Sequence, residues 1–321
     1  MIPELKGKGL FVFSDPGGAK PVLALIKLNQ ELKDYLVVSD REYDFFSDFN
    51  ITVTSYTTGS EDHILTRFSP DFIFTGTSYT SSIELNFILA AKKFNISSYA
   101  FVDHYTNFSN RFELNGVLVY PDTICVLDIK AHSLVMGYQT FADVIITSNF
   151  YHDYLKALKA PVSKDFFFTE SMIPKKNKLL VFAPEPLSNV GGIDEYGLDE
   201  VSVFKDLLKA ASSLQRSDIS IIIRSHPNQR KALIENINLP ESIHIISGDN
   251  LHLNTLLYHA DMVIGIFSNI LLEATILRTT VIRSLVGLKK EDPYADLHVG
   301  HVAHSQAELA MLIQQNLCSQ L

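Results

Sequence analysis

Residues 219–223 form an apolar run that ends abruptly in polar side chains. Arg224, His226 and Pro227 follow the run within four positions, and the carboxyl ends of strands are where open α/β sheets bind ligands. His226 can donate to a phosphate oxygen, Arg224 supplies positive charge, and Pro227 ends the strand. We therefore predict a phosphate site here, with His226 as its main residue, although the strand pleat can turn Arg224 away.

A second apolar strand, at about 262–266, ends where Ser268 and Asn269 open a helix. The hydroxyl group and the free N–H groups of a helix start favour a phosphate or diphosphate. Glu273 lies just over one turn further on and is expected to accept hydrogen bonds from ribose hydroxyls, because an unpaired buried glutamate would be costly. The alternative is a buried acid that only stabilises the helix.

A third strand, residues 178–183, leads into a loop that carries Glu185 and Ser188 and then two glycines. We expect Glu185 and Ser188 to line the ligand site, with a loop that closes over the donor. An ordinary surface loop is the alternative.

The first strand of the chain, at about 9–14, ends in Asp15 and a glycine pair, Gly17 and Gly18, before a helix begins. Glycines let the backbone turn tightly and approach a ligand closely. The dinucleotide fingerprint G-x-G-x-x-G is absent. Asp15 is therefore predicted to act on an acceptor substrate, and the alternative is that it merely caps the helix.

Asp103 and His104 follow the strand predicted at about 97–102. They are candidates for a base or for groups that orient a sugar hydroxyl. A histidine after a strand is also often structural.

Strand and helix patterns alternate along the whole chain, which is typical of parallel sheets covered by helices on both faces. The fold class is therefore α/β, with an N-terminal Rossmann-like domain at 1–160 and a C-terminal one at 161–321 facing a central cleft. The polar, proline-containing stretch 158–177 marks the boundary. Further strands are predicted at 35–39, 71–75, 122–127, 143–147, 219–224, 243–247 and 279–283, and helices at Ala19–Leu32, Ser81–Phe94, 199–214 and 305–317.

Composition narrows the class of partner. The chain of 321 residues is 46% hydrophobic and 20% charged, which is ordinary for a globular protein. A net charge of −9 argues against general binding to nucleic acid. Its two cysteines, Cys125 and Cys318, suggest neither a disulfide framework nor a zinc site, so we expect a reducing cytoplasm. No apolar window reaches membrane-spanning length, and peripheral membrane attachment through a partner stays open.

These motifs resemble those of GT-B nucleotide-sugar glycosyltransferases, a family with two Rossmann-like domains. Within it, the sequence is similar to bacterial sialyltransferase-like and capsule-polymer transferases, which direct a His-Pro pair and a Ser-Ser or Ser-Thr pair at the donor phosphate. His226-Pro227 matches the first pair, and Ser268-Asn269 matches the second imperfectly. Teichoic-acid transferases are similar in carrying Arg-x-His-Pro, here 224–227.

The resemblance implies an inverting glycosyltransferase that needs no metal and no cofactor. It would move a sugar, such as a nonulosonic acid, from a CMP-linked or other nucleotide donor to a surface glycan or protein. The N-terminal domain would bind the acceptor through Gly17, Gly18, Asp103 and His104, with Asp15 as base, and the C-terminal domain would bind the donor.

Two other functions remain open. UDP-N-acetylglucosamine 2-epimerases share the architecture, but this chain lacks their Ser-Gly-Gly turn at 268–270. An epimerase-like enzyme or a UDP-sugar transferase is the enzymatic alternative, and a non-catalytic nucleotide-sugar-binding protein is the other.

Overall fold

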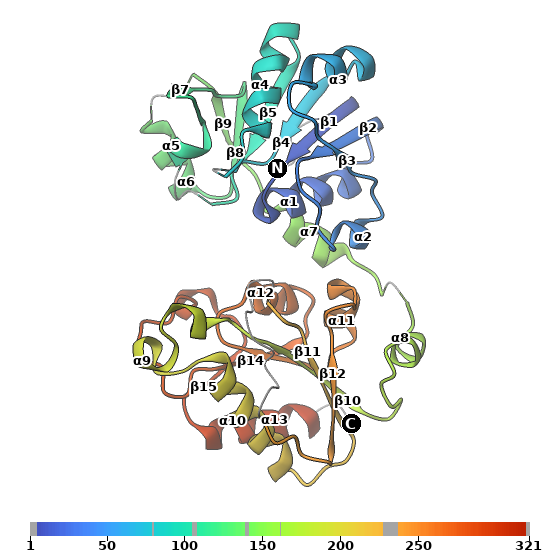
Figure 1. Ribbon diagram of the computed structural model, residues 1–321, viewed down its shortest axis with the longest axis vertical. Coiled ribbons are helices and arrows are strands. Elements are labelled where there is room, and N and C mark those ends of the chain that lie inside the picture. The colour runs from blue at the N-terminus through green and yellow to red at the C-terminus, as the bar shows by residue number, and fades with distance from the viewer. Residues whose placement is uncertain are drawn as a thin grey trace. The chain divides into compact units, whose positions relative to one another are not determined.

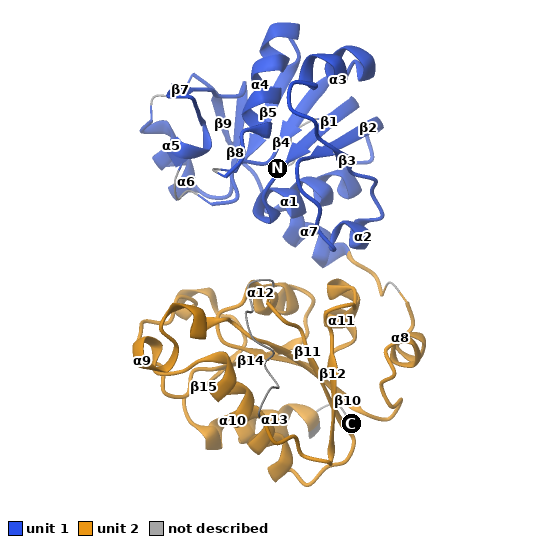
Figure 2. Cartoon of the chain, in the orientation of Figure 1, with its two compact units in different colours: residues 1–157 blue, residues 158–321 orange. Residues whose placement is uncertain are grey.

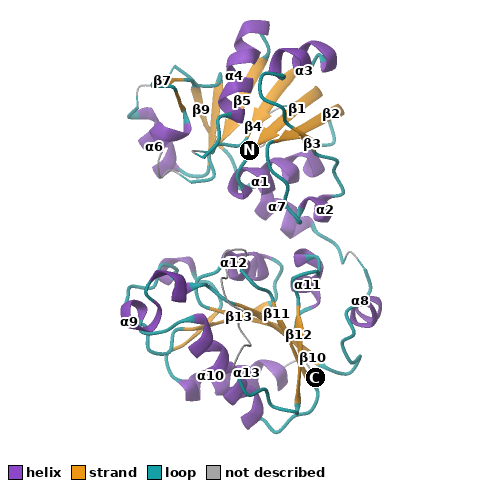
Figure 3. Cartoon of the chain, in the orientation of Figure 1, coloured by secondary structure: helices purple, strands orange, loops and turns teal. Residues whose placement is uncertain are grey.

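The computed structural model describes residues 5–78, 80–104, 108–138, 141–160, 162–226 and 237–318. The chain divides into two compact units, residues 1–157 and 158–321 (Figure 1, Figure 2). Each unit has a parallel sheet with helices around it, which confirms the predicted α/β class with two Rossmann-like units (Figure 3). Among the described residues, no helix is both long enough and apolar enough to cross a membrane.

Unit 1 contains a seven-stranded parallel sheet in the order β3-β2-β1-β4-β5-β8-β9 and a separate two-stranded hairpin. The sheet strands are β1 (Gly7–Phe13), β2 (Leu32–Ser39), β3 (Thr54–Ser55), β4 (Phe72–Thr75), β5 (Ser97–Phe101), β8 (Thr123–Val126) and β9 (Asp143–Ile146). The hairpin pairs β6 (Glu113–Leu114) with β7 (Val117–Leu118). The helices are α1 (Pro16–Leu28), α2 (Phe46–Phe49), α3 (Glu61–Phe68), α4 (Ile83–Phe94), α5 (Phe108–Arg111), α6 (Ile129–Met136) and α7 (Phe150–Ala157).

Unit 2 contains a six-stranded parallel sheet in the order β12-β11-β10-β13-β14-β15. The strands are β10 (Lys178–Ala183), β11 (Ile219–Ile223), β12 (Ile243–Ser247), β13 (Met262–Gly265), β14 (Thr280–Ser284) and β15 (His301–Ala303). The helices are α8 (Lys164–Glu170), α9 (Gly192–Tyr196), α10 (Glu200–Ser213), α11 (Leu253–His259), α12 (Asn269–Ile276) and α13 (Gln306–Cys318), with 3-10 turns at Leu187–Val190 and Ala295–Leu297.

The central strands of both sheets are buried on both faces, so their sequences are continuous apolar runs. All five residues of β11 are buried, and every residue of β1 except Lys8 is buried. The unit 2 core has a layer on each face of its sheet, one including Phe182 and Phe204 and the other Phe168 and Leu271. Because parallel strands end at the same edge, this burial leaves the polar residues that follow each strand together at the carboxyl edge.

Both sheets reverse their strand order beside their first strand. In unit 1, β1 pairs with β2 on one side and β4 on the other. In unit 2, β10 pairs likewise with β11 and β13. Such a switch point opens a crevice at the carboxyl edge, where α/β sheets bind ligands.

Several boundaries differ from the sequence-based prediction. The first helix begins at Pro16 rather than Ala19, because proline is favoured in a first helical turn. It ends at Leu28, and Leu32 already belongs to β2. The stretch 158–177 contains the short helix α8, capped by Ser163. The short strands β3 and β15 and the β6–β7 hairpin were not predicted, because two or three residues carry too little periodicity.

Candidate functional site

The carboxyl edge of the unit 2 sheet gathers three of the predicted polar segments. Phe182 of β10 is in register with Ile223 of β11 and with Ile264 of β13, so these three neighbouring strands end at one level. Glu185 comes two residues after β10, and Ser268 comes three residues after β13. The sheet therefore brings together segments that lie far apart in the sequence.

Glu185 lies at this edge, where its charge interacts with several neighbouring side chains. Burial raises the pKa of its carboxyl group, the negative charge of Glu200 acts in the same direction, and His226 opposes both by lowering it. Burial also raises the pKa of Tyr294 to about 12, and the charge of Glu185 adds to that shift. Glu185 thus interacts with side chains from three other segments, those of Glu200, His226 and Tyr294. Two of these side chains, an imidazole and a phenol, can hydrogen-bond to phosphate and hydroxyl groups.

Tyr294 belongs to this edge but was missed by sequence reasoning. Its hydroxyl group donates to Asn269 Oδ1 at 3.3 Å, and its ring makes an edge contact with Phe267 at 6.4 Å between centroids. Arg283 lies 5.8 Å from the centre of the same ring. Tyr294 stands in the loop after β14, and only the tertiary fold returns that loop to the start of α12.

Ser268 and Asn269 form the start of α12 as predicted from the sequence. Ser268 is buried, and its Oγ accepts from the N–H of Ile270 at 3.4 Å. Asn269 is exposed. The remaining N–H groups of this first turn carry the positive end of the helix dipole, which favours an anion.

Arg224 makes contacts that stabilise a loop. Its Nη1 donates to the carbonyl oxygens of Gly248 and Asp249, both at 2.7 Å, and of Leu251 at 3.1 Å. These bonds secure the β12–α11 connection beside the edge. The phosphate-binding role of Arg224 stays a prediction, and Pro227 lies outside the described residues.

Ser188 is hydrogen-bonded to a neighbouring carboxylate, and Glu273 is buried in its helix. The backbone N–H and the hydroxyl of Ser188 both donate to the buried carboxylate of Glu200, at 3.1 and 2.5 Å. Glu273 is 5% exposed within α12. Donor binding by either residue remains a prediction.

The carboxyl edge of unit 1 holds Asp15 in an ion pair. Arg41 Nη1 donates to Asp15 Oδ1 at 2.7 Å, and the hydroxyl of Thr80 donates to the same oxygen at 3.0 Å. Arg41 also donates from Nη2 to Thr80 at 2.7 Å. Asp15 makes no side-chain cap on α1, so its carboxylate is directed to these partners and not to the helix.

Asp103 forms a second ion pair at the same edge. Arg111, which is buried, donates from Nη1 to Asp103 Oδ1 at 2.8 Å and to the carbonyl of Thr77 at 2.8 Å. A Cβ atom on Gly17 would lie 2.1 Å from Asp103 Oδ2. The glycine is therefore needed for the close approach of the two segments. His104 follows Asp103 and is exposed.

Gly18 meets a different neighbour. A Cβ atom on it would lie 3.0 Å from Gly76 Cα, in the segment after β4. The glycine pair thus lets the start of α1 pack against the switch point, which explains the pair without a ligand. The predicted acceptor contacts of Gly17 and Gly18 stay predictions.

Glu84, in the first turn of α4, was also missed. Its side chain is 2% exposed, accepts from the N–H of Ser14 at 3.0 Å and lies 3.2 Å from the hydroxyl of Ser78. Burial raises its pKa to about 7, and the charge of Asp15 adds to the shift. An acid early in a helix normally signals a solvated, dipole-stabilising position, so the sequence gives no sign of this burial.

The described residues contain no group of three or more His, Cys, Asp or Glu side chains arranged to hold a metal ion.

Neither a protein-family model nor a curated protein sequence matches this chain. Solved structures do match its fold. A UDP-GlcNAc 2-epimerase from Methanocaldococcus jannaschii has a TM-score of 0.64 at 15% identity, with 96% of this chain and 92% of that chain covered. A UDP-GlcNAc 2-epimerase from Neisseria meningitidis, solved with UDP-GlcNAc bound, has a TM-score of 0.59 at 16% identity, covering 96% and 91%.

The ADP-heptose heptosyltransferase II of E. coli has a TM-score of 0.58 at 12% identity, covering 98% of this chain and 99% of that chain. Identities this low show the fold alone. The chain therefore has the GT-B-like fold, with two Rossmann-like units, that is shared by these nucleotide-sugar epimerases and by a glycosyltransferase.

Proposed function

We propose that this protein is an enzyme that acts on a nucleotide-diphosphate sugar, and that a UDP-sugar epimerase-like activity is the first candidate. The observation that carries the proposal is that β10, β11 and β13 end at one level, so that Glu185, His226 and the start of α12 follow neighbouring strands at the carboxyl edge of unit 2. The fold match to epimerases, one of them solved with UDP-GlcNAc, favours uridine nucleotides over the cytidine nucleotides expected from the sequence.

In this proposal His226 and the first turn of α12 hold the diphosphate. A partly buried imidazole and a helix N-terminus supply donors in fixed positions, which stabilise phosphate charge without reorganisation. Glu185 accepts hydrogen bonds from hydroxyl groups of the ligand. Asp15, at the carboxyl edge of unit 1, takes a proton from the substrate.

Glycosyl transfer is the second candidate function. It is supported by the fold match to a heptosyltransferase along the full length of both chains and by a carboxylate, Asp15, at the end of β1. In this version the nucleotide leaves with its phosphate charge at the unit 2 edge, while Asp15 deprotonates an acceptor hydroxyl. A CMP-linked nonulosonic acid belongs to this candidate.

Calorimetric titration with UDP, UDP-GlcNAc, CDP and CMP tests the nucleotide site. We expect UDP to bind and His226→Ala to weaken its affinity about ten- to a hundredfold, the cost of one hydrogen bond to a charged group. The matched control is His63→Ala, an exposed histidine of α3. Equal affinities for the His226 variant and the parent would contradict the site.

Proton NMR of reaction mixtures separates the two reactions. Appearance of the C2 epimer of the UDP-sugar identifies an epimerase, whereas release of free nucleotide only when an acceptor glycan is present identifies a transferase. Binding without either product, unchanged by Asp15→Asn, would leave a non-catalytic nucleotide-sugar-binding protein.

A further inference from the structure

Glu84 joins the two strand ends that flank the switch point of unit 1. Its Oε1 accepts from the backbone N–H of Ser14, directly after β1, at 3.0 Å. Its Oε2 lies 3.2 Å from the hydroxyl of Ser78, in the segment after β4. One carboxyl group from α4 therefore bridges the segments that follow β1 and β4 at the switch point of the sheet.

The two acceptors around Ser78 favour a proton on this carboxyl group. The Ser78 Oγ lies 3.2 Å from Glu84 Oε2 and 3.3 Å from the carbonyl oxygen of Ser81, and a hydroxyl has one proton to donate. If Oε2 carries a proton, it donates to Ser78, Ser78 donates to Ser81, and Oε1 accepts from Ser14. The neutral acid leaves the Ser78 proton to Ser81, whereas a carboxylate competes with the Ser81 carbonyl for that proton. The N–H groups of Ser14 and of Glu84 itself can donate to either form.

The electrostatic surroundings agree with a neutral acid. Burial and the charge of Asp15 disfavour the carboxylate, and only the hydrogen bonds from backbone N–H groups and from Ser78 oppose them. On the adjacent helix α3, Glu61 accepts from Tyr56 and Asp62 pairs with Lys93. Two arginines lie at this edge, and both are paired, Arg41 with Asp15 and Arg111 with Asp103.

We propose that Glu84 is a positioning residue for Asp15: as a neutral acid it holds the Ser14 backbone against Ser78, and this sets the orientation of the neighbouring Asp15 carboxylate. The inference rests on the proposed function, in which Asp15 takes a proton from the substrate. Glu84 itself is buried and contacts no substrate. Its proton keeps a second negative charge away from Asp15 while preserving the bridge.

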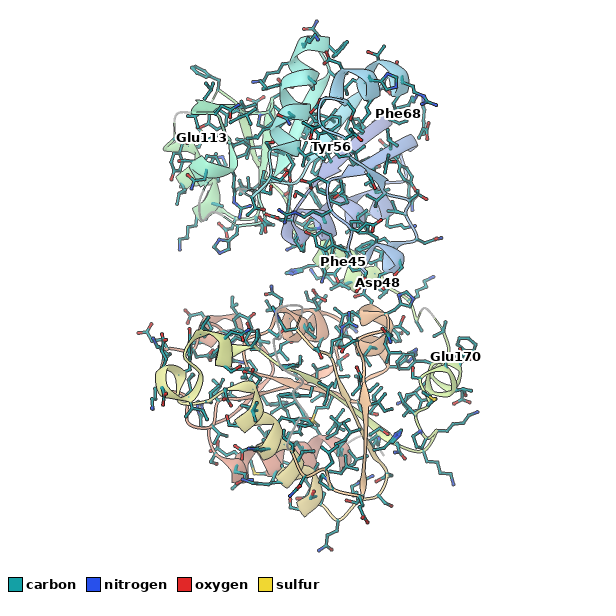
Figure 4. All side chains as sticks on the ribbon, viewed as in Figure 1. Phe45, Asp48, Tyr56, Phe68, Glu113 and Glu170 are labelled. Carbon is teal, nitrogen blue, oxygen red and sulfur yellow. The ribbon has the colours of Figure 1, made fainter. Side chains whose placement is uncertain are left out.

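Glu84→Gln is the decisive variant because a glutamine amide reproduces the neutral acid. Its oxygen accepts from Ser14 and its NH₂ donates to Ser78. Glu84→Ala removes the bridge, and the matched control is Glu113→Gln on the exposed β6–β7 hairpin (Figure 4). We expect the amide resonances of Ser14, Asp15 and Gly17 to keep their positions at pH 6 in Glu84→Gln and Glu113→Gln, and to move in Glu84→Ala.

A pH titration of the parent protein tests the proton directly. The Ser14 amide resonance should titrate in the parent, lose that titration in Glu84→Gln, and titrate at a lower pH in Asp15→Asn, where the repelling charge is gone. A Ser14 amide that does not titrate between pH 5 and 9, or a Glu84→Gln variant that moves the three amides, would overturn the proposal even if Glu84→Ala fails to fold.

Kinetics distinguish this inference from the proposed function. With an active enzyme, Glu84→Ala should lower kcat at least tenfold with little change in KM for the nucleotide sugar, and Glu84→Gln should keep most of the activity. A kcat of Glu84→Ala equal to that of the parent refutes positioning. If the parent turns over no nucleotide sugar, the proposed function fails, and the amide resonances still decide whether Glu84 positions Asp15.

Discussion

The carboxyl edges of the two sheets follow the same kind of strand order, but their charged side chains have different partners. At the unit 1 edge two half-buried carboxylates each pair with an arginine, Asp15 with Arg41 and Asp103 with Arg111. At the unit 2 edge the charge of Glu185 interacts with His226 and Tyr294, and the start of α12 lies at the same edge. The comparison teaches that the same strand order can present ion-paired carboxylates at one edge and a carboxylate beside a helix start at the other.

Among the changes that test this comparison, removal of the buried Arg111 should have the largest effect on unfolding free energy. Arg111→Ala leaves Asp103 and the carbonyl of Thr77 without their shared cation. Breaking a largely buried pair costs about 3 kcal/mol of unfolding free energy, measured by urea denaturation. The more exposed ion pair, Arg41 with Asp15, provides the control, because Arg41→Ala should cost about 1 kcal/mol or less of unfolding free energy. Equal losses would show that burial does not distinguish the two pairs.

The pH dependence of stability should reveal the neutral acid of unit 1. The pKa of Glu84 is about 7 in the folded protein and near 4.3 when unfolded. Between these values the folded state binds more protons, so the stability of the parent should fall as pH rises, by up to about 1.4 kcal/mol per pH unit.

The same measurement on Glu84→Gln isolates that contribution. Relative to this variant, the parent should lose about 2–3 kcal/mol of unfolding free energy between pH 4.5 and 7.5. Denaturation midpoints collected across this range give the difference. Parallel pH curves for the two proteins would contradict a raised pKa.

Close backbone approach at the unit 1 edge should be sensitive to one methyl group. Gly17→Ala places a Cβ atom 2.1 Å from Asp103 Oδ2, and relief of the overlap displaces that carboxylate from Arg111, at a cost of about 1–2 kcal/mol. Thermal denaturation measures the cost. In an Asp103→Ala background the same glycine change should cost less, and an additive double mutant would refute the clash.

The smallest effect should come from the unit 2 edge. Tyr294→Phe removes the hydroxyl that donates to Asn269, an exposed hydrogen bond of about 0.5–1 kcal/mol. UDP affinity should weaken severalfold, with little change in unfolding free energy. Calorimetric titration checks the affinity, and a loss as large as that of His226→Ala would mean that Tyr294 contributes as much to the site as His226 does.

Much of the fold could be predicted from local pattern. The strands at 72–75, 178–183 and 243–247 lie within a residue of their predicted positions, because continuous apolar runs bounded by polar residues are specific to buried parallel strands. The Ser268 helix start was likewise visible, since capping is a local interaction. Two-residue strands and the proline start of α1 carried weaker local signals.

Candidate residues were harder to predict, because their partners are remote in sequence. Arg224 shows why: the strand end was located correctly, yet its guanidinium contacts carbonyls of the β12–α11 loop. Tyr294 and Glu84 gave no local sign of their roles. Their significance depends on which segments the sheet order places beside them.

The sequence by itself determined the α/β class, the succession of strands and helices, and the polar residues that end each strand, because these follow from hydrophobic periodicity and capping over a few residues. Only the tertiary structure decided the pairing of Asp15 with Arg41, the burial of Glu84, and the approach of Tyr294 to Asn269. Charge compensation and desolvation depend on neighbours supplied by distant segments, and the order of strands in the sheet determines those neighbours.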